Sequence, residues 1–258
     1  MKPSFGKAAE DYARHRAGFP DSIFDRLRAL GVGTRRQRVV DLGTGTGTLA
    51  RGFARRGCEV IGIDPDAALL EQARELDREA GVAVDYRLGR AEDTGLADGS
   101  VDVVSAGQCW HWFERETAAR EALRVLRCGA RIVIAHFDWL PLEGNLVAAT
   151  ERLIESHNPA WKLGGGVGIY PAWFSDLARA GFLGIESFSY DLEVPYTPKA
   201  WRGRIRASAG VGASLTPEQV GSFDRDLQAL LAREFPGEAL AVPHRIFAVL
   251  ARSPKTAE

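Results

Sequence analysis

Two aspartates and three closely spaced glycines stand where an apolar stretch gives way to a helical one. Asp41 precedes Gly43 by two residues, Gly45 and Gly47 follow, and Asp64 ends the next apolar run. Glycine permits tight backbone turns, and without a side chain it lets a ligand lie against the main chain. The first N–H groups of the following helix point toward such a ligand. This pattern is typical of a nucleotide-like molecule bound at the carboxyl edge of a parallel sheet.

The glycine spacing argues against a nicotinamide-dependent oxidoreductase, the first alternative. The dinucleotide fingerprint G-x-G-x-x-G, counted from Gly43, needs its third glycine at Thr48, whereas the sequence has it one place early at Gly47. Asp41 also stands in a strand that should be apolar. A buried carboxylate needs hydrogen bonds or a cation. A ligand ammonium or the N–H groups of the glycine turn would serve.

A second group of side chains suited to chemistry follows the fourth apolar run, in Gln108-Cys109-Trp110-His111-Trp112-Phe113. His111 is a candidate general base, because histidine titrates near neutral pH; a packed, hydrogen-bonded histidine is the alternative. Trp110 offers an aromatic wall for a cation. His136, at the end of the fifth run, is a second candidate near the substrate.

Three arginines fall within five positions in Trp201-Arg202-Gly203-Arg204-Ile205-Arg206. On a helix Arg202 and Arg206 share one face, and this face could bind an acidic ligand bidentately or simply be solvated. Trp161, in the glycine-rich stretch 161–168, is a further candidate for contact with the substrate.

Strands and helices alternate over the first half of the chain, which predicts a doubly wound, mostly parallel α/β sheet. The expected strands are Arg38–Leu42, Cys58–Asp64, Ala83–Leu88, Val101–Ala106 and Ala130–Ala135, and the expected helices are Ala8–Arg16, Ser22–Leu30, Leu49–Arg56, Pro65–Ala80 and Glu116–Leu126, the last ended by Cys128-Gly129. The helix to Ala80 should bury Leu69, Leu70, Ala73 and Leu76.

The regular alternation of strands and helices ends after His136. We expect helices at Asn145–Ser156, Trp173–Ala180, Lys199–Arg206 and Pro217–Glu234, and strands at Ile185–Val194 and His244–Ala251. The expected division is an N-terminal helical lid at 1–36, a cofactor-binding core at 37–139, and a C-terminal half of the sheet at 140–258. Insertions near 140–172 and 195–240 would form a helical cap over the ligand.

Composition narrows the choice of partners. The 258 residues are 45% apolar and carry a net charge of −1, which gives no footprint for nucleic acid. No apolar run is long enough for a membrane span. Three cysteines without metal-ligand spacing suit a reducing cytoplasm and predict no metal site. A monomer and a homodimer are both compatible with the sequence.

Four motifs, in this order, resemble those of class I S-adenosylmethionine-dependent methyltransferases. They are Val39–Gly47, Val60–Pro65, Gly89–Val104 and Glu121–Ala130, where Cys128 and Ala130 replace the usual proline and second glycine. The resemblance implies a seven-stranded Rossmann-like methyltransferase fold, S-adenosylmethionine as cofactor and S-adenosylhomocysteine as product.

The resemblance also assigns cofactor contacts. They are Asp41, Gly43, Thr44, Gly45, Asp64, Pro65, Ala91, Glu92 and Gln108, with Asp64 on the ribose hydroxyls and Ala91 and Glu92 near the adenine. Phe5–Pro20 and Gln108–Phe113 are similar to small-molecule methyltransferases related to trans-aconitate methyltransferase. That likeness places Phe5, Tyr12 and Arg16 over the methionine end of the cofactor.

The expected function is therefore methyl transfer to a small molecule. Because the sulfonium already activates the methyl group, alignment of the reactants and exclusion of water would supply most of the catalysis. A methyltransferase-like protein that binds the cofactor without catalysis is the remaining alternative.

Overall fold

The computed structural model describes residues 18–255, which fall into two compact units. Of these residues, unit 1 comprises Asp138–Ile169 and Tyr190–Arg245, and unit 2 comprises Gly18–Phe137, Tyr170–Ser189 and 246–255. The segments expected as insertions, near 140–172 and 195–240, make up most of unit 1.

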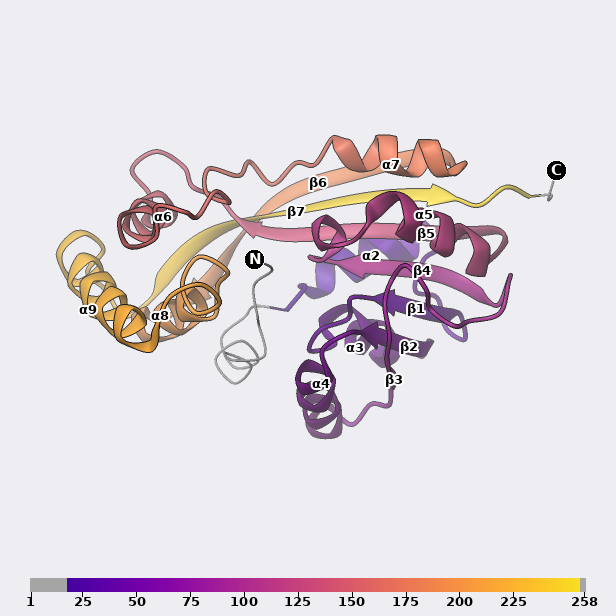
Figure 1. Cartoon of the computed structure of the whole chain (residues 1–258), viewed down its shortest axis with the longest axis horizontal. Coiled ribbons are helices and arrows are strands. Elements are labelled where there is room, and N and C mark those ends of the chain that lie inside the picture. Colours follow the sequence, from indigo (N-terminus) through magenta and orange to yellow (C-terminus); the bar gives the residue numbers. More distant parts are fainter. Residues whose placement is uncertain (1–17, 256–258) are drawn as a thin grey trace. The chain divides into compact units, whose positions relative to one another are not determined.

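The strands form one seven-stranded sheet in the order β3-β2-β1-β4-β5-β7-β6 (Figure 1). Their bounds are Arg38–Leu42 (β1), Glu59–Asp64 (β2), Asp85–Leu88 (β3), Val101–Gly107 (β4), Leu126–Trp139 (β5), Leu183–Tyr196 (β6) and Leu240–Arg252 (β7). The pairs β1–β2, β1–β4, β2–β3 and β4–β5 are parallel, and β7 runs opposite to β5. The predicted doubly wound, mostly parallel sheet is confirmed.

Eight α-helices are described. Unit 2 holds Asp21–Ala29 (α2), Thr48–Arg55 (α3), Ala67–Ala80 (α4), Arg115–Val125 (α5) and Ala172–Ala180 (α7), and unit 1 holds Leu146–His157 (α6), Pro198–Arg206 (α8) and Pro217–Glu234 (α9). A short 3₁₀ turn, η2, covers Trp110–Trp112. Among residues 18–255, no helix has the length and apolar character needed to cross a bilayer.

The central strands are buried along almost their whole length. In β1 the residues from Val39 to Leu42 are inaccessible, as are Val103, Val104 and Ala106 of β4. Strands covered on both faces are expected to be continuous β-branched and apolar runs, which explains why the sequence pattern located them.

Strand β5 begins earlier than expected. The helix predicted to reach Leu126 ends at Val125, and Leu126 already pairs with Val101. Gly129, expected in a turn after the helix, lies inside β5 with φ 72°, beside a shift in the β4–β5 register. Polar residues at this end of the strand hid the pairing, because main-chain hydrogen bonds do not require an apolar side chain.

Unit 1 has a separate apolar core built around Trp201, which is fully buried. The Trp201 indole Nε1 donates to Thr150 Oγ1 at 3.1 Å. Its ring meets those of Trp139 and Tyr196 edge-on, at 5.6 and 5.4 Å between centroids. This geometry is favourable for aromatic pairs, and it joins α8 to the ends of β5 and β6.

The buried face of α4 differs from the expectation at one position. Leu69, Leu70 and Ala73 are buried as predicted, but the fourth buried residue is Asp77, whereas Leu76 is only partly covered. A carboxylate on an apolar helix face must have a partner, and α3 supplies one, described below.

Asp41 is buried between β1 and β4, and its partners differ from those expected. The Thr44 hydroxyl donates to Oδ2 and the Ser105 hydroxyl to Oδ1, each at 2.7 Å. Burial raises the pKa of Asp41 to about 6, although both hydroxyls oppose the shift. Neighbouring hydroxyls thus satisfy a carboxylate for which a ligand cation or the glycine-turn N–H groups were expected.

The raised pKa predicts how Asp41→Asn changes stability with pH. The folded state binds the Asp41 proton more tightly than the unfolded chain, so wild-type stability falls as pH rises from about 4 to about 6. Asparagine lacks this loss, so the free energy of unfolding of the variant relative to wild type should rise by roughly 3 kcal/mol between pH 4 and pH 8. Urea titrations at the two pH values measure it. A difference independent of pH would contradict the assignment.

Candidate functional site

The loop after β1 is hydrogen-bonded to the last two residues of β2 in unit 2. The Thr44 N–H donates to the Ile63 carbonyl at 3.0 Å, and the Gly45 N–H donates to Asp64 Oδ2 at 2.8 Å. Parallel strands bring their carboxyl ends to the same edge of a sheet. The structure therefore brings together the glycine loop and the acid that the sequence analysis assigned to one cofactor.

The glycine loop leaves open space at one position. A Cβ built on Gly45 would meet no atom of residues 18–255 within 4 Å, and its φ of 55° is one that side-chain-bearing residues rarely adopt. At Gly43, by contrast, the Cys109 and Phe113 side chains lie 2.9 Å from a built Cβ. A ligand thus has access to the main chain at Gly45.

The carboxylate of Asp64 retains capacity to bind a ligand. Oδ1 accepts the Asp66 N–H at 2.9 Å and Oδ2 accepts that of Gly45, one bond to each oxygen. A carboxylate has about four acceptor sites, so one more donor fits on each oxygen. Burial raises the pKa of Asp64, against the effect of these two hydrogen bonds. Pro65, which follows it, is exposed.

The loop after β3 contains Ala91 and Glu92. Ala91 is buried, and Glu92 Oε1 accepts the Glu114 N–H at 2.9 Å. Burial alone would raise the pKa of Glu92, but this hydrogen bond and the charge of Arg90 lower it. Glu92 therefore stays ionised and links this loop to the start of α5.

The loop after β4 is fixed to both neighbouring strands. Gln108, with φ 60°, donates its side-chain amide to the Phe137 carbonyl at 3.0 Å. The Cys109 thiol donates to the Leu42 carbonyl at 3.1 Å, and the Trp110 indole donates to Asp176 Oδ2 at 3.0 Å. Trp110 is fully buried, so its indole is held in place by packing and by this bond.

Two histidines and a tyrosine lie side by side in unit 2. The rings of His111 and His136 are 5.4 Å apart, and the Tyr170 hydroxyl lies 3.3 Å from His136 Nδ1. Tyr170 in turn stacks on Trp173 at 4.3 Å. Sequence reasoning singled out both histidines but missed Tyr170, which lies 34 residues after His136 in the chain.

In unit 1, Arg202 and Arg206 do share a helix face, and both bind Asp224 of α9. Arg206 Nη1 is 2.9 Å from Asp224 Oδ1, and Arg202 makes a bidentate contact with the same carboxylate. Trp161 lies in the loop after α6, partly buried and close to Gly210.

Arg204, on the opposite side of α8, has different surroundings. Its guanidinium lies over the Trp139 ring, 4.7 Å from the centroid. Burial lowers the pKa of Arg204, whereas Tyr196 and Asp138 raise it. Among residues 18–255 no carboxylate forms an ion pair with it. Sequence reasoning named its two neighbours and passed it over.

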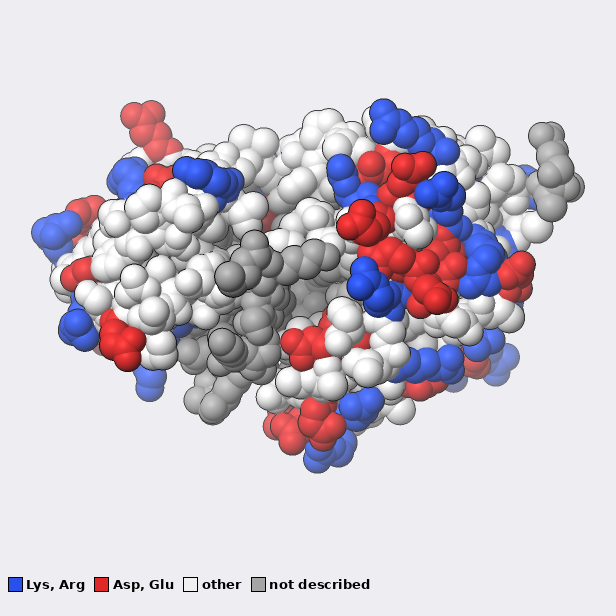
Figure 2. Space-filling view, viewed as in Figure 1, with Lys and Arg blue, Asp and Glu red and all other residues white. Residues whose placement is uncertain are grey.

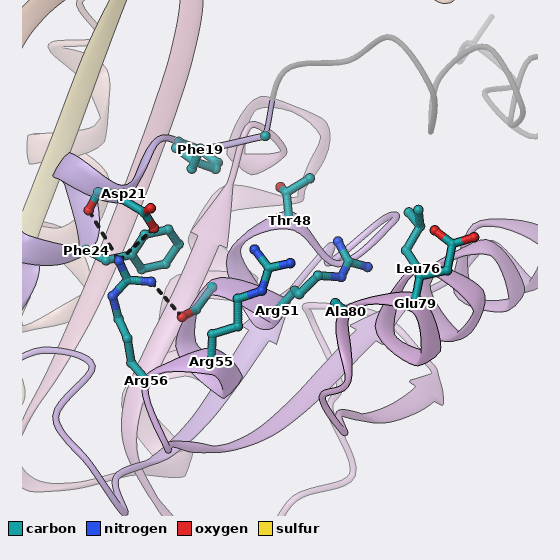
Figure 3. A pocket seen from close by; sticks show the side chains of 12 residues that line it. Phe19, Asp21, Phe24, Thr48, Arg51, Arg55, Arg56, Leu76, Glu79 and Ala80 are labelled. Carbon is teal, nitrogen blue, oxygen red and sulfur yellow. Dashed lines mark hydrogen bonds and ion pairs between the residues drawn. The ribbon is translucent and has the colours of Figure 1, made fainter.

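A pocket of about 340 Å³ lies elsewhere in unit 2, between α2, α3 and α4 (Figure 3). Arg51, Arg55 and Arg56 line it together with Asp21 and Glu79. It includes no residue that the sequence analysis assigned to the cofactor or the acceptor.

The distribution of charged side chains and of potential metal ligands bears on whether the described residues form a nucleic-acid surface or a metal site. On the face shown in Figure 2, acidic and basic side chains lie close together, and the described residues form no continuous basic stripe there. No cluster of three potential metal ligands occurs within residues 18–255. Phe5, Tyr12 and Arg16 lie outside the described residues.

Comparison with known proteins finds a similarity to methyltransferases in the first half of the chain. Residues 40–134 match the family model described as "Methyltransferase domain". An uncharacterised methyltransferase of Mycobacterium tuberculosis is 39% identical over 132 residues, which are 51% of each chain. The chain thus spans about half the length of the curated relatives it matches.

Solved structures share the fold. A proposed type II methyltransferase from Anaeromyxobacter dehalogenans aligns with a TM-score of 0.64 at 22% identity, covering 94% of this chain and 99% of that one. Phosphoethanolamine N-methyltransferase 2 of Haemonchus contortus, bound to phosphomonomethylethanolamine and S-adenosylhomocysteine, aligns with a TM-score of 0.57 at 19% identity, covering 97% and 57%. Residues 40–134 therefore resemble a methyltransferase domain, and the seven-stranded sheet has the strand order of the Rossmann-like methyltransferase fold.

Proposed function

We propose that this protein transfers a methyl group from S-adenosylmethionine to a small acidic acceptor and releases S-adenosylhomocysteine. The observation that carries the proposal is the pairing of Asp64, which has room for one more donor on each oxygen, with the main chain at Gly45, which no side chain of residues 18–255 covers. The ribose of the cofactor carries two neighbouring hydroxyl groups, and the two oxygens of the Asp64 carboxylate are suitable acceptors for both.

The other cofactor contacts follow from the loops at the same edge. Main-chain groups from Gly43 to Gly45 would hold the methionine end, and Ala91 with Glu92 would flank the adenine. Gln108 uses its side-chain nitrogen on Phe137, so its amide oxygen or main chain would face the ligand. Asp41 and Thr44 bind each other, so we assign Asp41 to holding Thr44 in position. Pro65, and by resemblance Phe5, Tyr12 and Arg16, complete the set.

The bound cofactor supplies a methyl group made electrophilic by its sulfonium, so the protein's part is to align the acceptor and exclude water. We assign proton acceptance to His111, with His136 beside it and Tyr170 fixing the orientation of the His136 ring. A carboxylate oxygen is already deprotonated at neutral pH and would need no base.

Arg204 is our candidate for binding the acidic group of the acceptor, in place of Arg202 and Arg206. Arg202 and Arg206 are both engaged by Asp224, whereas Arg204 lies over the Trp139 ring with no carboxylate partner in the described part of the chain. His244 adds no second positive charge to this part of unit 1, because burial lowers its pKa to about 4 and leaves the imidazole neutral. The planar guanidinium fork suits a carboxylate. Trp110 and Trp161 remain candidates for contact with the rest of the acceptor.

The cofactor assignment predicts the effect of Asp64→Ala. Loss of two charge-assisted hydrogen bonds should weaken S-adenosylhomocysteine binding by about 2–4 kcal/mol, or roughly 30- to 1000-fold. Calorimetry measures the dissociation constant, with Asp85→Asn, an exposed carboxylate on β3, as the control. If NAD binds wild type and S-adenosylhomocysteine does not, the proposed function is wrong.

The acceptor assignment predicts the effect of Arg204→Gln on a panel of small carboxylic acids and their primary amides. S-adenosylhomocysteine formation, followed by mass spectrometry, should fall about 10- to 100-fold for the acids, with smaller losses in Arg202→Gln. Because Arg204 is partly buried and forms no ion pair among residues 18–255, the melting temperature of the variant should change little. Equal turnover of acids by wild type and variant would reject Arg204.

A base at position 111 predicts the effect of His111→Asn. Its kcat should fall about 10²- to 10⁴-fold, and the limb of the pH–rate profile due to this histidine should disappear. His157→Asn is the control, since His157 pairs with Asp226 in unit 1. Unchanged turnover and pH dependence would show that His111 is not the base and that the methyl group goes to an atom that is already deprotonated.

A further inference from the structure

Arg51, which lines the pocket in Figure 3, forms a buried ion pair next to the glycine loop. Asp77 of α4 is almost inaccessible, and its Oδ1 is 2.6 Å from Arg51 Nε of α3. Figure 3 shows Arg51 extending from α3 toward α4. Neither residue was expected from the sequence to contribute to the cofactor site.

The same arginine reaches the glycine loop with its other nitrogen. Arg51 Nη2 donates to the Thr46 carbonyl at 2.8 Å and to the Ala73 carbonyl at 3.2 Å. Hydrogen bonds from an ionised donor are shorter and stronger than neutral ones. Asp77 thus orients a guanidinium that holds the main chain of the loop directly.

Tyr86 of β3 closes the other side of this arrangement. Its hydroxyl lies 2.1 Å from where a Cβ on Gly47 would stand, so no side chain fits there. Burial, followed by the negative charge of Asp77, raises the pKa of Tyr86 far above its usual value, and the hydroxyl stays protonated. Gly47 is therefore held between a neutral phenol and the carbonyl contact at Thr46.

We propose that Asp77 is a positioning residue for cofactor binding, acting through Arg51 on the main chain of Thr46. The proposal rests on the proposed function in taking the glycine loop as the cofactor cradle. Removing one member of a buried ion pair leaves the other charge unpaired. Loss of Asp77 should therefore release Arg51 from Thr46 and loosen the loop locally.

The test compares Asp77→Asn and Arg51→Lys with Glu79→Gln and Arg55→Met. The control residues line the same pocket on the same two helices, but the structure gives them no contact with the loop. The first readout needs no ligand: amide hydrogen exchange over residues 43–48 should accelerate at least about 10-fold in Asp77→Asn relative to Glu79→Gln. The second is calorimetry with S-adenosylhomocysteine, whose dissociation constant should rise about 10-fold, with controls within about twofold of wild type.

Arg51→Lys distinguishes the two contacts, because lysine keeps the charge next to Asp77 but lacks the fork that also reaches Thr46. It should accelerate exchange in the loop while the melting temperature stays near that of wild type. Unchanged loop exchange in both variants would overturn the proposal. Equally accelerated amide exchange across β1 and β4 would also overturn it, since the ion pair would then stabilise unit 2 as a whole and not the loop in particular. If wild type binds no S-adenosylhomocysteine, the proposed function fails, and hydrogen exchange still decides the role of Asp77.

Discussion

Three buried carboxylates hold three successive residues of the glycine loop. Asp41 accepts the Thr44 hydroxyl, Asp64 accepts the Gly45 N–H, and Asp77 orients the arginine that binds the Thr46 carbonyl. A chain that changes from strand to helix within a few residues leaves main-chain groups without regular partners. Here side chains from β1, β2 and α4 take their place, and the geometry of the remaining loop groups depends on them.

Two of these acids could be found in the sequence, because each ends or interrupts an apolar strand. Asp41 and Asp64 stand where a buried strand should contain no charge, and the structure places both beside the loop. The third was missed, although a signal existed. Asp77 occupies a buried position of α4, four residues after Ala73, and helical periodicity alone would have placed it on that face. Its partner on α3 could not be deduced, since helix–helix contacts depend on tertiary packing.

The order of strands and helices was predictable for a similar physical reason. Buried parallel strands are continuous apolar runs, and glycines and helix caps mark their ends. The ends of β5 and β7 were not predictable, because polar residues such as Arg127 join the sheet through their main chain. The residues proposed to bind the acceptor were the hardest to predict from the sequence. That Arg202 and Arg206 share a face followed from periodicity, but their contacts with Asp224, 22 and 18 residues later respectively, did not.

The surroundings of Arg204 predict how this position should vary among homologous proteins. Arg204 is partly buried over the Trp139 ring and forms no ion pair within residues 18–255, so substitution by an apolar residue should cost the fold little stability. The proposed role of Arg204 in ligand binding would account for an arginine at this position, which folding does not require. Among homologues, position 204 should lose its charge in lineages that have changed their ligand, while Trp139 and Trp201 persist for packing. A comparison of lineages at this one position would then separate proteins of like ligand preference.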